Sequence, residues 1–531
     1  AGYELAFHDE FDGSTLDTNK WTPAFFPHWG GPSTSPGEVA RTEVSGGTLK
    51  LKSTTSEPAW SPHNWGSRSG IMSGMYSGAT GSKVGLIKDF CAADPACVVW
   101  SQYANQNQKA AVTQYGYFEI RAKGCSAGDC AWWMVGFEEN GLQNGEIDVF
   151  EMSHYAEADN SWQDFCIHFG THKWSDPNLP SDVLPPAANP TSHFYGETCA
   201  PYTQWHTYGL LWAPNQVSLY IDGALAKTFN HAPKYPMVTI FNTVIGLVAP
   251  DPAGFSQFEI DYFRIYKSHR LTQLSATMLN GSPGWGHVAA NAVDDDAATY
   301  AQSLTQNWDL ELDLLGTYSV EKVVFEPNWA NWAVDYQIQS STNGTSWTTQ
   351  KTVTGALGVT QSHSFSTPFA AKYLRINVTA QTGAYAHAIH SVEVHSATPL
   401  LQKVSQTATA TMLNGTPGWG HVAAHAIDET TTTYAQAVSQ FNWDLQLDLG
   451  RAREIGRVVV SPNWANFPTN YRILVSVDGT NWSTVRVVSN GNDQPQTFDF
   501  LATGRYVRLD VTNQVGSYPH AIHEFEVYAY P

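Results

Sequence analysis

Hydrophobic and polar residues alternate along many short stretches of the chain. Asp309-Leu-Glu-Leu-Asp-Leu314 and Tyr506-Val-Arg-Leu-Asp-Val511 have this period of two, which is typical of strands with one buried face. Similar strands are expected at residues 116–122, 208–212, 217–221 and 258–266. Clusters of Gly, Asn, Pro and Asp separate these stretches, and sustained helical periodicity is absent from the sequence. The pattern therefore predicts an all-β protein.

A long internal repeat divides the chain. Residues 277–290 recur almost unchanged as residues 411–424. Because solenoid repeats typically span only about 20–50 residues, this period indicates a duplicated domain. We therefore expect three β-sandwich domains, at residues 1–270, 271–398 and 405–531.

Composition narrows the functional class. Only 14% of the residues are charged, while 13% are aromatic, including 20 Trp. Aromatic residues beyond the needs of a core often provide flat surfaces on which sugar rings stack. The net charge of −20 argues against nucleic acid, whose phosphates require clustered Lys and Arg, and makes a strongly anionic polysaccharide a less favourable substrate. A run of about 20 apolar residues, as a membrane-spanning helix needs, does not occur in the sequence.

All six cysteines lie in the first half of the chain. Their even number and the lack of Cys-X-X-Cys spacing favour disulfides, and hence a secreted, extracellular protein, which we expect to be a monomer. Pairing by proximity in the sequence would join Cys91 to Cys97, Cys125 to Cys130 and Cys166 to Cys199.

The strongest candidate for chemistry is the segment Gly145-Glu-Ile-Asp-Val-Phe-Glu151. In a regular strand Glu146 and Asp148 share one face while Glu151 points to the other, but one β-bulge after Asp148 would return Glu151 to their face. Glu146 and Glu151 would then lie about four strand steps apart, roughly 13 Å between Cα atoms. Inward-leaning side chains can reduce this to roughly 5–6 Å, as in a retaining glycosidase.

The mechanism assigns a role to each acid. Glu146 would be the nucleophile, Glu151 the acid and then the base, and Asp148 would orient Glu146 and help to keep Glu151 protonated. Catalysis by this set needs no cofactor. The alternative is that all three acids lie on a solvent-facing edge strand.

The segment resembles the bulged E-x-D-x-x-E signature of glycoside hydrolase family 16, the β-jelly rolls of laminarinases and agarases. Residues 8–13, 115–121, 205–212 with 220–223, and 261–266 resemble other segments of this family in the same order. The resemblance implies that Trp133 lines the subsite beside the cut and that His168 contacts the sugar, although His168 could equally pack in the core. It also implies a structural calcium, bound by the Asp261 side chain and main-chain oxygens of Glu10 and Gly47.

One departure from the family concerns the substrate. Laminarinases usually carry a Trp-Pro pair before the catalytic strand, where this chain has Asn140-Gly-Leu-Gln-Asn144. This weakens a β-1,3-glucanase assignment and favours a galactan or a less common polymer. The insertion at residues 91–108 is expected to wall one end of the substrate cleft.

Four segments of the second copy, residues 442–450, 478–482, 504–508 and 524–528, have counterparts in the first. On these segments the two copies resemble carbohydrate-binding modules of family 32, which are discoidin-like β-sandwiches. In such modules, loop aromatics and histidines at one end of the sandwich often bind sugar. The matching residues are Trp285, His287, Trp329, Tyr385 and His387 in the first copy, and Trp419, His421, Trp464, Tyr518 and His520 in the second. The resemblance places Trp308, Trp443, Trp347 and Trp482 in the core.

The same resemblance implies structural calcium in the copies, because oxygen ligands suit this ion. Asp294 with Thr299, and Asp428 with Thr433, match the family's calcium-binding loop. The acidic ligand expected near the last strand is Glu524 in the second copy, but the first copy has Ser391 there. Calcium is therefore expected mainly in the second copy.

Together these features predict a secreted retaining endo-glycosidase of a β-1,3- or β-1,4-linked glucan or galactan, with two modules that bind a polysaccharide. A transglycosylase would use the same intermediate, and a non-catalytic adhesion protein would use the same folds. A polysaccharide lyase would need a Tyr/His/Arg set instead of paired carboxylates.

Overall fold

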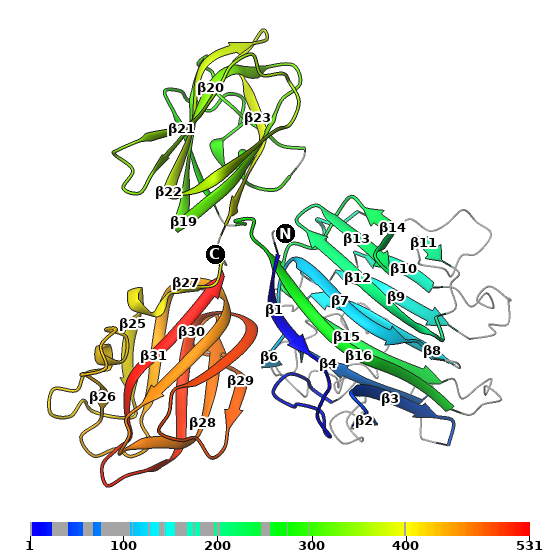
Figure 1. Ribbon diagram of the computed structural model, residues 1–531, viewed down its shortest axis with the longest axis vertical. Coiled ribbons are helices and arrows are strands. Elements are labelled where there is room, and N and C mark those ends of the chain that lie inside the picture. Colours follow the sequence, from blue (N-terminus) through cyan, green and yellow to red (C-terminus); the bar gives the residue numbers. More distant parts are fainter. Residues whose placement is uncertain are drawn as a thin grey trace. The chain divides into compact units, whose positions relative to one another are not determined.

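The computed structural model describes residues 3–23, 41–56, 67–75, 107–108, 110–125, 128–136, 143, 145–153, 167–173, 176–180, 196–198, 202–245, 255–272, 274–296, 298–397 and 400–530. These residues form strands and short 3-10 turns, which confirms the predicted all-β class (Figure 1). Among them, no helix is long and apolar enough to cross a membrane.

The first domain is built on two antiparallel sheets. The larger has the order β14-β13-β12-β7-β16-β3-β2, with β1 also pairing with β16, and the smaller has the order β11-β10-β9-β8-β15-β4. The bounds of the larger sheet are β1 (Tyr3–Asp9), β2 (Thr42–Ser45), β3 (Thr48–Thr54), β7 (Gly116–Lys123), β12 (Trp205–Ala213), β13 (Gln216–Ile221), β14 (Ala224–Phe229) and β16 (Phe255–Ser268). Those of the smaller are β4 (Ser67–Met72), β8 (Asp129–Gly136), β9 (Glu146–Ser153), β10 (Ile167–His172), β11 (Gly196–Thr198) and β15 (Met237–Ile245), while β5 (Gly74–Met75) and β6 (Asn107–Gln108) form a separate pair.

Aromatic side chains fill the space between these two sheets. The rings of Phe150 on β9 and Tyr208 on β12 lie 4.6 Å apart, and Trp132 on β8 lies 6.1 Å from Phe263 on β16. All four are buried, as is Phe241 of β15. Since successive strand residues alternate between faces, this packing leaves the other face of the smaller sheet for function.

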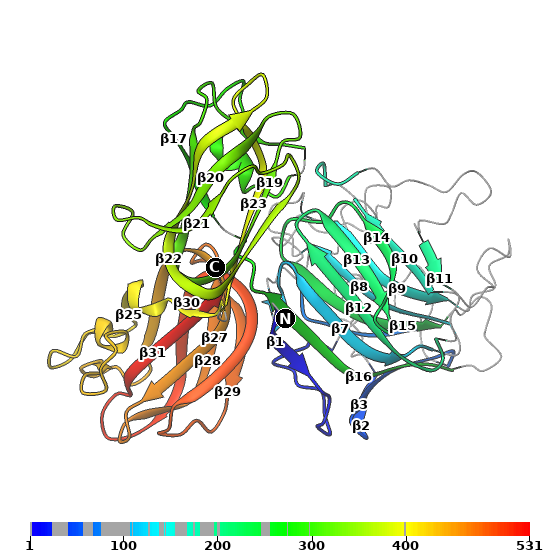
Figure 2. The ribbon, with the colours of Figure 1, turned by 45° about the horizontal axis from the view of Figure 1, so that its top comes forward.

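The two repeated domains have matching topologies. The first copy has the order β18-β23-β19-β22-β20-β21 with β17 on β19, and the second has β24-β31-β27-β30-β28-β29 with β25 on β27 and β26 on β31. The first comprises β17 (Ser275–Leu279), η3 (Ala289–Ala292), β18 (Ala301–Gln302), β19 (Asp309–Pro327), β20 (Trp332–Ser341), β21 (Thr348–Val353), β22 (Gln361–Thr382) and β23 (Ala388–Ser396). The second comprises β24 (Gln402–Lys403), η4 (Ser405–Thr407), β25 (Thr409–Leu413), η5 (Ala423–Ala426), β26 (Ala435–Gln436), β27 (Asp444–Pro462), β28 (Phe467–Ser476), β29 (Ser483–Val488), β30 (Gln496–Val515) and β31 (Ala521–Tyr530). A second view shows the strands of each copy (Figure 2).

Contacts group the chain into two compact units. One comprises Ala1–Glu4, Lys267–Gln402 and Tyr530–Pro531, and the other Leu5–Tyr266 and Lys403–Ala529. Each described strand belongs to the sheets of one domain only. The exact domain boundaries stay predictions.

Candidate active site and binding surfaces

The acidic strand β9 contains the predicted bulge. Asp148 pairs with Trp133 of β8, and Glu151 pairs with Ala131. Thus β9 advances three residues where β8 advances two, and the pairing with β10 shifts at the same place. Because directly paired residues share a face, Glu151 lies on the same face as Asp148 and Glu146. This confirms the arrangement expected from the spacing of the acids.

These acids lie on the face turned away from the aromatic core, yet two of them, Glu146 and Asp148, are hardly exposed. Glu146 is 8% exposed and Asp148 only 2%. Since buried carboxylates are unfavourable without partners, contacts must compensate for their desolvation. Oδ2 of Asp148 has no hydrogen-bond partner among the described residues, but it lies 3.0 Å from Nε2 of His172 on β10, which forms an ion pair when the imidazole is protonated.

Glu151 has a different electrostatic environment. Glu151 is only partly exposed to solvent. This burial, followed by the negative charges of Asp148, Asp129 and Glu146, raises the pKa of Glu151 well above its usual value. A raised pKa lets the carboxyl keep its proton to higher pH, which suits a general acid.

Trp133 and His168 lie on the face of the acids. Trp133 is paired with Asp148, and its indole Nε1 donates a hydrogen bond of 2.7 Å to Oδ1 of Asn242 on β15. His168 is directly opposite Glu151 on β10. Both side chains are buried. The structure thus brings together the five residues that the sequence singled out for catalysis and sugar contact in this domain.

A polar contact fixes the start of β9. The backbone N–H of Gly145 donates to the hydroxyl of Tyr235 at 2.6 Å, and this hydroxyl donates to Oδ2 of Asp176 at 2.8 Å. A side chain at position 145 would collide with Leu179 and the Tyr235 hydroxyl, which explains the glycine before Glu146. Sequence reasoning missed this contact, because its members are far apart along the chain.

Several predicted features lie outside the described residues. They include Cys91, Cys97, Cys166 and Cys199, most of the insertion, and most of residues 140–144. Cys125 and Cys130 are buried close together, with the Cys125 N–H 3.0 Å from Cys130 Sγ, but they are free thiols in this structure, contrary to the predicted disulfide. Two cysteines five residues apart can be neighbours across a turn without being bonded.

Each repeated domain presents the same exposed aromatic residues. Trp285 and Tyr385 meet edge to face, with ring centroids 5.8 Å apart, and Trp419 and Tyr518 repeat this arrangement at 6.0 Å. All four are well exposed, as are Trp329 and Trp464 at 79% and 77%. Such exposure of large rings is unfavourable in water, so these residues are candidates for ligand stacking.

The first tryptophan of each set has a strained backbone. Trp285 and Trp419 both have φ of 51°, in the left-handed region that bulky residues rarely adopt. Gly286 and Gly420 follow at 85° and 87°. The same strained conformation in both copies is typical of a residue held in place for function.

The histidines of the predicted sugar sites divide into two groups. His287 and His421 are partly exposed and stack on Tyr300 and Tyr434, with 4.0 Å between ring centroids in each copy. They therefore lie where a ligand can reach them.

His387 and His520 do not fit the prediction of direct sugar contact. Both are fully buried and stack on Trp308 and Trp443. Burial lowers the pKa of His387 to about 3 and that of His520 to about 4, so both are neutral core residues. Trp308 and Trp443 are buried as predicted, while Trp347 and Trp482 are partly covered by arginines, Arg375 at 3.9 Å and Arg508 at 4.0 Å from their rings.

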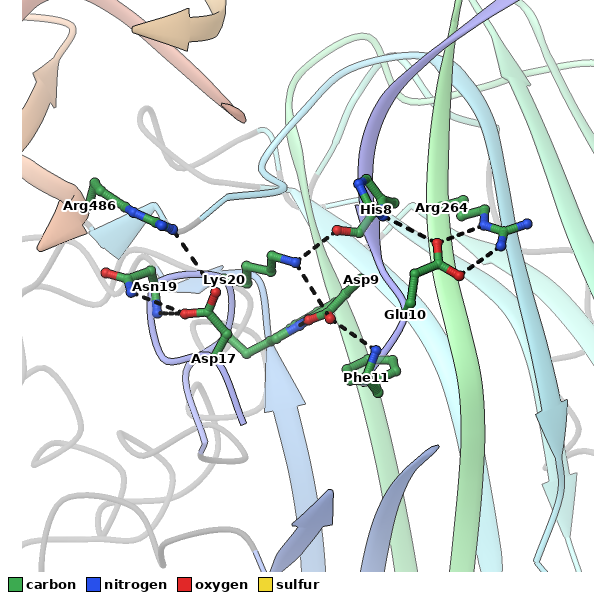
Figure 3. Close-up of polar contacts among 10 residues, drawn as sticks. His8, Asp9, Glu10, Phe11, Asp17, Asn19, Lys20, Arg264 and Arg486 are labelled. Carbon is green, nitrogen blue, oxygen red and sulfur yellow. Dashed lines mark hydrogen bonds and ion pairs between the residues drawn. The ribbon is translucent and has the colours of Figure 1, made fainter. Parts of the chain in front are cut away.

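The calcium site predicted for the first domain has unfavourable surroundings. Asp261, its side-chain ligand, accepts a hydrogen bond of 2.6 Å from Arg121. The carboxylate of Glu10 accepts hydrogen bonds from Nε and Nη2 of Arg264, at 2.9 and 2.7 Å (Figure 3). Because arginine repels a cation, these side chains do not fit a calcium ion, and ligation by main-chain oxygens of Glu10 and Gly47 stays a prediction.

The second copy fits calcium better than the first. Asp428 accepts a hydrogen bond of 2.7 Å from Thr433, and Oε1 of the buried Glu524 has no hydrogen-bond partner among the described residues. Burial, and then the charge of Asp428, raises the pKa of Glu524 to about 7. Two carboxylates that repel each other, one of them unsatisfied, are suited to a hard cation.

The first copy differs at one of these positions. Asp294 again accepts a hydrogen bond from its threonine, Thr299, at 2.8 Å. At the position of Glu524, however, Ser391 donates its hydroxyl to Glu326 at 3.0 Å. The first copy thus lacks the buried, unsatisfied carboxylate.

Comparisons with known proteins agree with this architecture. Residues 100–264 match the model of glycosyl hydrolases family 16, and residues 272–392 and 405–525 each match the F5/8 type C domain. Kappa-carrageenase from Pseudoalteromonas carrageenovora is 25% identical over 281 residues, which cover 46% of this chain and 67% of that protein.

Solved structures are also similar in part. An endo-β-galactosidase from Clostridium perfringens that releases GlcNAcα1-4Gal is 23% identical with a TM-score of 0.40, and the match covers 72% of this chain and 97% of that one. The catalytic domain of an endo-1,3-β-glucanase (laminarinase) from Thermotoga petrophila is 19% identical with a TM-score of 0.33, over 50% of this chain and 98% of that one. The matched family models alone identify residues 100–264 as a family 16 glycosyl hydrolase domain, followed by two F5/8 type C domains at residues 272–392 and 405–525.

Proposed function

We propose that the protein is a retaining endo-glycosidase that hydrolyses a β-linked polysaccharide. The observation that carries this proposal is the bulge in β9, which brings Glu146, Asp148 and Glu151 to one face. Three acids kept together away from bulk water are unfavourable for stability, and a reaction that needs two carboxyls in different protonation states explains them.

The proposed reaction proceeds by two displacements. Glu146 attacks the anomeric carbon while Glu151 gives its proton to the departing glycosidic oxygen, which leaves a glycosyl ester on Glu146. Glu151, now ionised, then takes a proton from water, and the water oxygen displaces Glu146 with net retention of configuration. Asp148 supplies negative charge beside Glu151, which favours its protonated form before the first step.

The substrate is proposed to be a β-glucan or β-galactan. The likeness to kappa-carrageenase supports a galactan backbone. The net charge of −20 favours a polymer with few anionic groups over a heavily sulfated one. Trp133 provides an indole beside Asp148 on the face of the acids, where a sugar ring could stack.

The repeated domains are proposed to bind the polymer through the exposed aromatic sets around Trp285 and Trp419. Their exposure and strained backbone support a binding role. An extracellular location and a calcium ion at Asp428 and Glu524 complete the proposal.

Product analysis tests the catalytic assignment. The protein would be incubated with β-glucans, agar, porphyran, carrageenan and arabinogalactan, and the anomeric configuration of the first product would be followed by NMR. We expect one polymer to be cut internally with retention, and Glu146→Gln to reduce kcat at least about 10³-fold. The matched control is Glu119→Gln, the same isosteric change on β7 of the other sheet, and should retain activity.

Other outcomes separate the alternatives. Products longer than the substrate would indicate transglycosylation, in which a sugar replaces water in the second step. Binding of a polymer without any cleavage by the wild-type protein would contradict the proposed hydrolase and favour the adhesion function.

A further inference from the structure

His172 stands out because it enters the acid cluster from the neighbouring strand. In the pairing of β10 with β9, His172 is opposite Glu146, and Gly170 is opposite Asp148. Gly170 has no side chain to fill the space beside Asp148. The imidazole of His172 can therefore lean along the sheet, and its Nε2 comes within 3.0 Å of Asp148 Oδ2.

The contact is close and shielded from water. Both side chains are buried, His172 at 7% exposure and Asp148 at 2%. Ring nitrogen and carboxylate oxygens of His172, Asp148 and Glu146 all lie within 4.8 Å of one another. In such a setting the orientation of one group limits the orientations open to the other two.

The titratable groups that face His172 are almost all acidic. On β9 they are Glu146, Asp148 and Glu151, with Asp129 of β8 also acting on Glu151. On its own strand, His168 lies opposite Glu151. A protonated His172 would offset part of the repulsion among the acids.

We propose that His172 is a positioning residue of the active site, which holds Asp148 between Glu146 and Glu151 and balances the negative charge of the three acids. This inference rests on the proposed function. It is supported by the pairing of β10 with β9 and by the distances among His172, Asp148 and Glu146 given above. Nothing in the sequence alone distinguished His172 from the other histidines.

The test compares His172→Gln with Thr171→Val. Thr171 precedes His172 on β10, points to the other face, and contacts His231 at 2.7 Å, so its replacement controls for damage to the strand. We expect His172→Gln to lower kcat about 10–100-fold while KM changes less than about threefold, because Asp148 is misplaced but the substrate contacts remain. Thr171→Val should keep at least about half of the wild-type kcat.

The pH profile separates positioning from simple destabilisation. Since the charge of His172 lowers the pKa of Glu151, its removal should move the alkaline limb of kcat/KM to higher pH. An unchanged kcat and an unchanged alkaline limb in His172→Gln would overturn the proposal. Equal losses in both variants with the wild-type pH profile would also overturn it, since only a structural role would remain.

A second readout does not depend on activity. If the wild-type protein cleaves no polymer, thermal unfolding of both variants still tests the ion pair. His172→Gln should lose more stability at about pH 5.5 than at about pH 8.5, because only protonated histidine attracts the acids. A loss that is equal at both pH values would contradict the ion pair, whereas absent cleavage alone would contradict only the hydrolase function.

Discussion

At the scale of single residues, Glu146 and Glu151 are the same amino acid in different surroundings. Burial and three neighbouring carboxylates raise the pKa of Glu151 well above its usual value. The group with the raised pKa must be protonated to act as an acid, so polymer cleavage should decline only as the pH rises through this raised pKa, above the usual range of a glutamate.

Replacing Glu151 by Ala should therefore affect substrates according to their leaving groups. For the polymer, whose departing sugar needs a proton, we expect kcat/KM to fall about 10²–10⁴-fold. For a dinitrophenyl glycoside, which leaves without a proton, the loss in the first step should be far smaller. Steady-state kinetics on both substrates would check this, and equal losses would contradict the acid role.

The sequence predicted the carboxylates better than the histidines. The acids interrupt an apolar strand, and this contrast is visible in the sequence. His387 and His520 gave no comparable signal, because a lone histidine in a predicted loop is equally consistent with exposure and with the stacking on buried Trp308 and Trp443 that the structure shows.

At the scale of elements, the strand β9 needs support at its first residue. Tyr235 provides it by accepting from Gly145 and donating to Asp176. The bulge could be inferred from the spacing of the acids, because a strand has a fixed period. The support from Tyr235 could not be inferred from the sequence, because the contact among residues 145, 176 and 235 depends on the tertiary structure.

Tyr235→Phe should weaken this element. The substitution removes the hydroxyl that bonds both the Gly145 N–H and the Asp176 carboxylate. Both groups are buried, so the loss of this partner costs about 1–3 kcal/mol of unfolding free energy. We also expect a lower kcat with little change in KM, as Glu146 begins the affected strand. Denaturant unfolding and kinetics would be compared with Tyr220→Phe, a partly exposed tyrosine of β13. Wild-type stability and kcat in Tyr235→Phe would refute this role.

The calcium loop of the second copy makes a separate prediction. Calcium at about 100 times its Kd should stabilise this domain by about 2.7 kcal/mol, because the ion binds the folded loop only. Glu524→Gln should abolish most of this effect, whereas Ser391→Ala in the first copy should not change it. Calorimetry with calcium and with a chelator would measure both, and a calcium response that survives in Glu524→Gln would exclude Glu524 as a ligand.

At the scale of the whole molecule, the chain combines one set of acids with two copies of an aromatic surface. The repeat of residues 277–290 was sufficient to predict the duplication, since sequence identity over such a stretch implies the same local fold. Which aromatics are exposed could be predicted only in part, because exposure depends on loop conformation.

Removing both aromatic surfaces should weaken polymer binding more than removing one. Asn is the suitable replacement for Trp285 and Trp419, since it tolerates the left-handed backbone that Ala would strain. We expect up to about tenfold weaker binding for each single variant and at least about 10²-fold for the double variant, as linked sites lose avidity. Affinity electrophoresis would measure this, with Leu225→Asn as a control for loss of an exposed apolar side chain. Wild-type binding by the double variant would exclude these surfaces.

The bulge in β9 has one more consequence, for the length of the strand. Between Glu146 and Glu151 the partner strand β8 runs from Val135 to Ala131, four steps, although β9 itself spans five. A chain lacking Val149 would cover the same four steps as a regular strand, with its three acids still on one face. The same active site can therefore be encoded by two sequence spacings, and the Val149 deletion should retain measurable hydrolysis. Deleting Ile147 instead would keep the bulge and turn Glu146 to the opposite face, so that variant should be inactive. Whether a single-residue deletion in this strand is tolerated or inactivating thus depends on whether it removes the bulge residue, which substitution data alone would not reveal.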